Sequence, residues 1–159
     1  MMKTVIRVLL LCVFCSFLLA SCASKQAEEQ IVVYSFNGEN EMFSISNGVI
    51  VLAPTEEVFY GGNLEGELPG VVSYSMTFYI SSGNDDKTLL SNKVTDMTGG
   101  TITISGETGK VSGDILNETE LNELQNNLYF ELKTTDLDGE ENTYSLQLTV
   151  TEVTGTQSK

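Results

Sequence analysis

The chain of 159 residues contains no histidine and no tryptophan, and only three cysteines. Without histidine, neither serine–histidine nor cysteine–histidine catalysis is available, and a zinc site cannot use imidazole ligands. Eight residues are basic against 22 acidic ones, which gives a formal charge of −14. Nucleic acids and anionic headgroups are bound through clustered lysine and arginine, so we expect neither as a partner.

The first 21 residues have the three zones of a secretory signal segment. Lys3 and Arg7 supply positive charge, an uncharged apolar run covers residues 8–19, and two small residues follow it. A membrane-spanning helix needs about 20 consecutive apolar residues, and this run is shorter. We therefore expect residues 1–21 to be a signal segment and not a transmembrane helix.

The signal segment ends in Leu19-Ala20-Ser21-Cys22, which closely resembles the lipobox of bacterial lipoproteins. The resemblance implies cleavage just before Cys22, a diacylglyceryl group on its thiol and acylation of the new amino group, with chains such as palmitate. Several acyl chains hold a protein firmly, since each buried CH₂ contributes about 0.8 kcal/mol. An ordinary signal peptide that is cut near a cysteine by chance is the alternative.

Lipidation at Cys22 predicts where the chain resides. Residues 22–30 are small, polar or charged and are expected to form a short lipidated tether. The domain behind it should therefore lie at the extracytoplasmic face of the cell membrane. In a host with two membranes the outer membrane is an alternative, because Ala23 provides no inner-membrane retention signal.

Cleavage before Cys22 would leave a domain without free thiols or disulfides. Cys12 and Cys15 leave with the signal segment, and Cys22 carries lipid. Lys3 and Arg7 leave too, so six lysines remain against 22 acidic residues, and the formal charge becomes −16. We expect the hydrophobic core alone to hold such a fold.

From residue 31 onward, short runs of alternating apolar and polar residues lie between turn signals, as in half-buried β-strands. The clearest run is residues 71–81, whose predicted core face carries Val72, Tyr74, Met76, Phe78 and Ile80. About nine or ten such strands predict an all-β, antiparallel, immunoglobulin-like sandwich over residues 31–154. A lipocalin-like barrel is the alternative, and residues 155–159 are expected to fray.

Two hairpins are predicted from turn signals. Asn47-Gly48 favours a two-residue turn that sets Ile45 opposite Ile50 and Phe43 opposite Leu52. Residues 128–134 should return through Asp138-Gly139 to a strand over residues 143–153.

One segment departs from the strand pattern. Asn117-Glu118-Thr119-Glu120 has the form of a helix N-terminus. It predicts a short helix or turn over residues 118–126 that crosses between the two sheets.

The acidic segment around Asp138-Gly139 is a candidate weak calcium site. Its carboxylates are Asp136, Asp138 and Glu140, and the hypothesis adds Asp85 and Asp86. With Gly139 at the sixth position of an EF-hand loop, threonine and serine would occupy the first and twelfth positions, so that motif fails. A solvated hairpin tip is the preferred explanation, because Asp-Gly is itself a turn signal. We predict no other cofactor.

Four aromatic residues are candidates for a binding surface. Tyr79 and Tyr129 fall on the polar faces of their strands, and Phe59 and Tyr60 precede Gly61-Gly62 at a predicted loop. Tyrosine offers apolar area together with a hydroxyl, which suits ligand contact. Cross-strand packing is the favoured alternative explanation for these residues.

The sequence favours a non-enzymatic binding or structural module of the cell envelope. Its expected partner is an envelope protein or glycan, in addition to the membrane that holds Cys22. Paired carboxylates could hydrolyse a glycan, but no pair lies in an apolar setting and no arginine would remain to position a substrate. We therefore predict no catalytic residue, and keep a small carboxylate-dependent extracytoplasmic hydrolase as the alternative.

Overall fold

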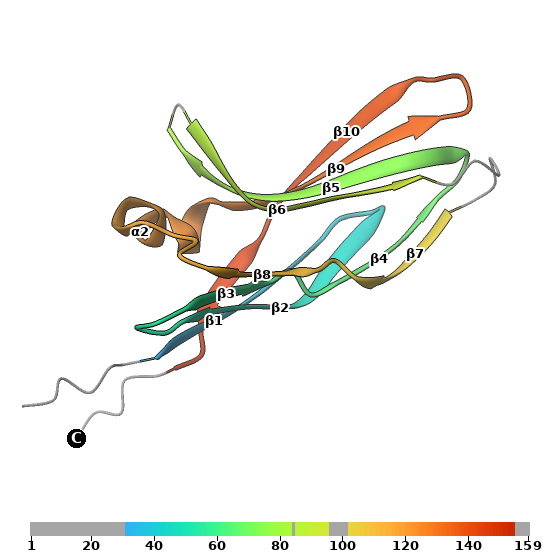
Figure 1. The fold of residues 1–159 in the computed structure, drawn as a ribbon. Coiled ribbons are helices and arrows are strands. Elements are labelled where there is room, and N and C mark those ends of the chain that lie inside the picture. Colours follow the sequence, from blue (N-terminus) through green and yellow to red (C-terminus); the bar gives the residue numbers. More distant parts are fainter. Residues whose placement is uncertain (1–30, 84, 96–101, 155–159) are drawn as a thin grey trace, which may run out of the picture.

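The computed structural model describes residues 31–83, 85–95 and 102–154, which form two antiparallel sheets and one helix (Figure 1). Sheet A contains β1 (Val32–Glu39), β2 (Phe43–Leu52), β3 (Glu57–Tyr60), β4 (Asn63–Leu68), β7 (Ile102–Glu107), β8 (Lys110–Gly113) and β11 (Thr149–Glu152). Sheet B contains β5 (Val71–Ser82), β6 (Asp85–Thr95), β9 (Leu128–Asp136) and β10 (Glu141–Gln147). The helix α2 (Glu118–Asn127) joins β8 to β9. The predicted sandwich is confirmed, and the described strands do not close into the alternative barrel.

The strand order shows how the chain moves between the two layers. Sheet A runs β11-β1-β2-β3-β8, with β4 beside β2 and β7 beside β4, and sheet B runs β10-β9-β5-β6. The signal segment, Cys22, its tether and the expected frayed end at residues 155–159 lie outside the described residues. Strands β1 and β11 are antiparallel neighbours, so the start of β1 and the end of β11 lie at the same end of the molecule (Figure 1).

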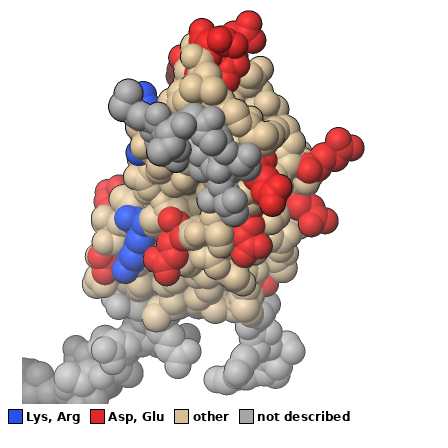
Figure 2. Space-filling view, turned by 90° about the vertical axis from the view of Figure 1, so that its right-hand side faces the viewer, with Lys and Arg blue, Asp and Glu red and all other residues tan. Residues whose placement is uncertain are grey.

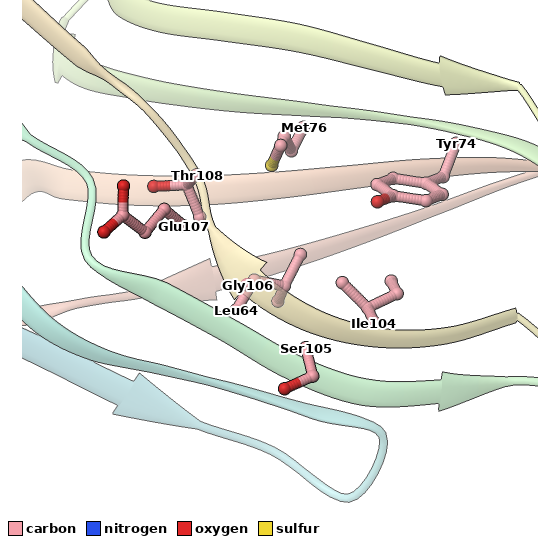
Figure 3. A pocket seen from close by; sticks show the side chains of 8 residues that line it. All are labelled: Leu64, Tyr74, Met76, Ile104, Ser105, Gly106, Glu107 and Thr108. Atoms are coloured by element: carbon pink, nitrogen blue, oxygen red, sulfur yellow. The ribbon is translucent and has the colours of Figure 1, made fainter.

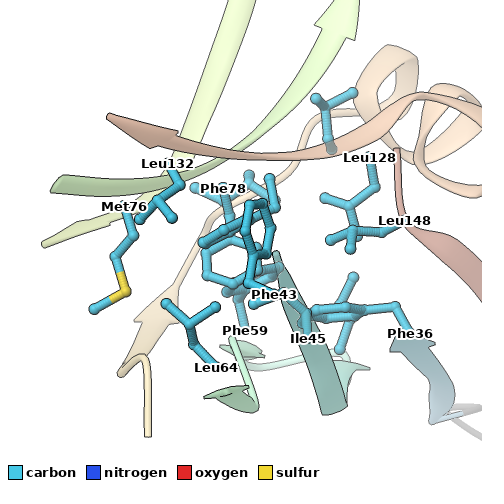
Figure 4. Packing of buried hydrophobic residues seen from close by; sticks show 14 of the residues in the cluster. Phe36, Phe43, Ile45, Phe59, Leu64, Met76, Phe78, Leu128, Leu132 and Leu148 are labelled. Atoms are coloured by element: carbon cyan, nitrogen blue, oxygen red, sulfur yellow. The ribbon is translucent and has the colours of Figure 1, made fainter. Parts of the chain in front are cut away.

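A cluster of five phenylalanines joins the two sheets. Figure 4 shows part of this core. Phe36 stacks on Phe59 within sheet A, with ring centroids 5.3 Å apart, and Phe78 contacts Phe130 within sheet B at 4.9 Å. Edge-on contacts of 5.3 Å between Phe59 and Phe78 and of 5.4 Å between Phe43 and Phe130 link the layers. Aromatic pairs in these geometries add about 0.5–1.5 kcal/mol each to the effect of burial. The core therefore lies midway between the sheets.

The hairpin predicted at Asn47-Gly48 is wrong, because β2 runs through these residues without turning. Its register against β1 shifts between Phe36 and Gly38, where β2 has one extra residue. Asn47 has a positive φ of 57°, as its turn signal suggested, but it forms a β-bulge. The bulge changes the phase of the strand, so the four predicted core residues still share one face: Phe43, Ile45 and Ile50 are buried, and Leu52 is half-buried against the core.

A second irregularity crosses sheet A beside this bulge. Strands β3 and β4 are separated by Gly61-Gly62, and the neighbouring β7 and β8 by Thr108-Gly109. The Gly61 amide donates to the Gly109 carbonyl at 3.0 Å, and the Thr108 amide donates to the Gly62 carbonyl at 2.9 Å. A Cβ on Gly62 would overlap the Ser46 carbonyl oxygen, so this close approach requires glycine. The predicted loop at Gly61-Gly62 is thus a kink in a continuous sheet.

The predicted helix is confirmed. The Asn117 side chain accepts from the backbone amides of Thr119 and Glu120 at 2.9 and 3.0 Å. The Glu120 carboxylate accepts from the Asn117 amide at 2.8 Å in return, which completes a capping box. Leu124 is fully buried, so the helix covers the end of the core between β5 and β11.

The second hairpin is confirmed, but the strand predicted over residues 143–153 is divided. Strand β10 ends at Gln147 in sheet B, and β11 continues in sheet A. Leu148 lies between them with 2% of its surface exposed, and its amide donates to the Leu128 carbonyl at 2.9 Å. A bulge between Val71 and Ser73 likewise buries Val71 in place of the predicted Val72.

Candidate functional site

The outward side of sheet B carries a continuous polar surface, called here the outer B face. Alternation along β5 and β9 sends their apolar residues into the core and the intervening residues outward. Cross-strand register groups sixteen outward residues in rows of four: Thr95, Ser73, Thr135 and Glu141; Lys93, Ser75, Lys133 and Thr143; Ser91, Thr77, Glu131 and Ser145; and Thr88, Tyr79, Tyr129 and Gln147. Nine of the sixteen are serine or threonine, and none is aliphatic.

Tyr79 and Tyr129 face each other directly in the pairing of β5 with β9. Their rings stack at a centroid distance of 5.5 Å and an interplanar angle of 15°. The Tyr79 hydroxyl lies 3.4 Å from the Ser145 hydroxyl on β10. The two rings thus show the cross-strand packing that the sequence favoured. They also form a half-exposed aromatic pair on a polar surface.

Other side chains of the outer B face are held by contacts among themselves. The hydroxyls of Thr77 and Ser91 are 3.1 Å apart, and Lys133 Nζ lies 3.0 Å from Glu131 Oε1. Lys93 lies in the same row as Lys133, on the opposite side of Ser75. Within these sixteen positions the two lysines balance Glu131 and Glu141, although the whole chain carries −14. The next pair along β5 and β6, Ser81 and Asp86, adds one negative charge beside them.

The two other candidate aromatics do not join this surface. Phe59 is 1% exposed and packs in the core between Phe36 and Phe78, so its prediction as a binding residue is wrong. Tyr60 lies in sheet A, paired with Val49 and Lys110. Partial burial raises the pKa of its phenol, and the Glu107 carboxylate raises that pKa further. Both residues therefore lie on β3 in sheet A, where Phe59 is buried in the core and Tyr60 is half-buried. Neither residue is part of the outer B face.

The acidic residues proposed to share a calcium ion lie at opposite ends of β5. Asp136 pairs with Val71 at its start, and Asp85 pairs with Ser82 at its end. The length of β5 separates them by about 35 Å, at roughly 3.3 Å per residue. The shared site is therefore wrong, and no group of three or more acidic, histidine or cysteine side chains in the described part of the chain could hold a metal ion.

The hairpin residues themselves have a local structural role. Asp136 Oδ1 accepts from the amides of Asp138 and Glu140 at 2.9 and 2.8 Å, which closes the turn between β9 and β10. Acidic side chains gather at the top of Figure 2, where Figure 1 places this hairpin. The hairpin thus gives the end of sheet B a strong negative charge.

Two hollows in the surface are alternative candidates for a site. The first, of about 150 Å³, lies between β4, β5 and β7 and is lined by Leu64, Tyr74, Met76, Ile104, Ser105, Gly106, Glu107 and Thr108 (Figure 3). Burial raises the pKa of the Tyr74 phenol. Glu107 is the one carboxylate among these lining residues, so the hollow offers no acid–base pair.

The second hollow, of about 170 Å³, lies beside the loop between β2 and β3. It is lined by Glu56, Glu57 and Asp114 together with Ala53, Pro54, Thr55 and Gly113. Glu57 Oε2 already accepts from the amides of Ile115 and Leu116 at 2.8 and 2.7 Å. Glu56 and Asp114 are exposed, so neither carboxylate lies in the apolar setting expected of a catalytic acid.

Comparisons with protein-family models, curated proteins and solved structures find no match to this chain. No helix among the described residues is long and apolar enough to cross a bilayer. Among the described residues, the outer B face is an organised polar surface that the packing of the core does not explain.

Proposed function

We propose that this chain is a lipid-anchored module of the bacterial cell envelope that binds an envelope component through the outer B face and catalyses no reaction. The lipobox-like segment ending in Cys22 supports the anchor. The observation that carries the binding proposal is the stacked pair of Tyr79 and Tyr129 within a surface of hydroxyls. A half-exposed aromatic pair with polar neighbours offers both apolar contact and hydrogen bonds to a ligand.

An anchor at Cys22 would leave this face accessible. Residues 22–30, fully extended, reach at most about 30 Å, so the end of the sandwich at which β1 begins would lie nearest the bilayer. The strands of sheet B run lengthwise from that end toward the β9–β10 hairpin (Figure 1). An extended ligand could therefore approach from the side of the domain.

The alternative hydrolase would need two carboxylates that face one cleft. Several carboxylates of the described residues serve the fold instead: Glu57 binds two backbone amides, Glu120 caps α2 and Asp136 closes a turn. These contacts support a non-enzymatic role.

Binding to envelope material tests the proposal. The mature lipidated protein, held in detergent micelles, would be sedimented with insoluble cell-wall material from the same host. We expect it to sediment with the material, and we expect Tyr79→Ser/Tyr129→Ser to lose most of that retention. Tyr60→Ser is the matched control, because it removes a half-buried tyrosine from the opposite sheet. Equal retention of the double variant, with an unchanged circular dichroism spectrum, would refute a role for this face.

A further inference from the structure

We infer that the ligand of the outer B face is a neutral glycan chain, a polymer of uncharged sugars. This inference rests on the proposed binding function of the face and names the chemical class of its ligand. Charge, surface chemistry and preorganisation each support it.

Charge favours an uncharged ligand. The outer B face is balanced, with Lys133 held against Glu131 at 3.0 Å, while the chain as a whole is strongly acidic. The field of the whole molecule repels an anionic polymer and attracts a cationic one to acidic surfaces such as the β9–β10 hairpin. A neutral polymer experiences neither effect, so only the local chemistry of the face decides where it binds.

The absence of aliphatic side chains argues against a protein partner for this face. Protein interfaces depend on apolar anchors buried at their centre, and the sixteen positions of the outer B face offer none beyond the two tyrosines. Sheet A is different, since Val33, Val51 and Val58 are neighbours in register. The sequence therefore places valines in adjacent strand positions of sheet A and none at the sixteen positions of the outer B face, although Val72 lies half-buried at the bulge beside its first row.

The chemistry of the face matches that of sugars. A pyranose ring has apolar C–H surfaces, which pack on aromatic rings, and a rim of hydroxyls that both donate and accept hydrogen bonds. Tyr79 and Tyr129 provide the aromatic surface, and the serine and threonine hydroxyls can also donate and accept. These hydroxyls recur about every 4.8 Å across the strands and about every 7 Å along them, so a polymer can contact several rows at once.

Contacts within the face reduce the entropy lost on binding. Hydroxyl pairs join Thr77 to Ser91 and Tyr79 to Ser145, so these side chains are already ordered without ligand. Preorganised groups lose less conformational freedom when a ligand binds. The four rows follow one another along the strands, so they can contact successive units of a long chain.

Affinity electrophoresis and sedimentation test the inference. The probes are four neutral polysaccharides (cellulose, β-1,3-glucan, starch and chitin) and one anionic polysaccharide, alginate. We expect the mature lipidated protein in detergent to bind at least one neutral polymer, with a Kd that changes less than about twofold between low and high salt. The double variant Tyr79→Ser/Tyr129→Ser should weaken this binding by about tenfold or more, and Tyr60→Ser should leave it unchanged.

Three results would overturn the inference: binding to none of the neutral polymers, tyrosine-independent binding, or salt-sensitive binding to alginate alone. The sedimentation assay with whole cell-wall material separates this failure from failure of the proposed function. If the tyrosine pair is needed for retention on the wall but no neutral polymer binds, the face binds another ligand. If retention on the wall is also independent of the pair, both proposals fail.

Discussion

At the scale of single residues, Asn47 and Gly48 show how far a local signal reaches. The dipeptide correctly indicates a positive φ, which Asn47 adopts at 57°. The sequence does not reveal that β2 pairs with β1 on one side and with β3 and β4 on the other. Pairing with these strands keeps β2 continuous through Asn47 and Gly48, so the residues that would turn a free hairpin form a bulge. The positive φ of Asn47 was predictable from the sequence. Whether it would form a turn or a bulge depended on the pairing of β2 with its neighbours.

Gly48 also leads to a stability prediction. A Cβ at this position would overlap the ring of Phe36, which is buried in the core. We expect Gly48→Ala to destabilise the domain by about 1–3 kcal/mol, because the ring must move within a packed core. Gly106→Ala is the control, since no atom lies within 4 Å of the place its methyl group would take, and it should be neutral or stabilising by about 0.5 kcal/mol. Urea unfolding midpoints measure both changes, and equal midpoints would contradict the prediction.

At the scale of elements, local chemistry predicts α2 well. The capping box uses residues three apart in the chain, so Asn117 and Glu120 were recognisable without knowledge of the fold. The change of sheet at Leu148 was not recognisable, because the alternating pattern continues from β10 into β11. The outer B face was missed for a different reason, because it depends on how distant strands pair. Its tyrosines were found individually, whereas the neighbours that make it a surface become visible only with the register.

The cap of α2 can be tested by substitution. Asn117→Ala removes the acceptor for two backbone amides and should lower the free energy of unfolding by about 1 kcal/mol. Asn117→Asp keeps an oxygen acceptor and should retain most of the stability. Thermal unfolding followed by circular dichroism measures the difference. If the alanine and aspartate variants melt together, the side-chain cap does not stabilise the helix as the structure indicates.

At the scale of the whole molecule, the sandwich followed from composition and alternation, because many short half-buried strands need a second layer to cover them. The distribution of strands between two sheets of seven and four did not follow, since it depends on contacts between distant residues. The same holds for the separation of the acidic clusters, which β5 places at its two ends. Charge was readable from the sequence, and its arrangement in space was not.

Lipidation at Cys22 would determine where the whole molecule resides. In cells grown with labelled palmitate, we expect the wild-type protein to carry the label and to fractionate with membranes. Cys22→Ala should abolish the label and prevent processing of the signal segment. Cys15→Ala is the control and should leave both unchanged, because that cysteine lies inside the segment expected to be removed. Persistent labelling of the Cys22 variant would place the lipid elsewhere or refute the anchor.

The interior position of β1 in sheet A has a mechanical consequence. The proposed tether joins the domain at the start of this strand, which is hydrogen-bonded to β2 on one side and to β11 on the other. A pull on the lipid acts along the strand, so it loads both antiparallel ladders in shear and does not open one bond after another from an edge. Force transmitted from a bound polymer would enter through sheet B and leave through this doubly held strand. The proposed anchor would therefore attach to the domain at a point suited to carrying tension.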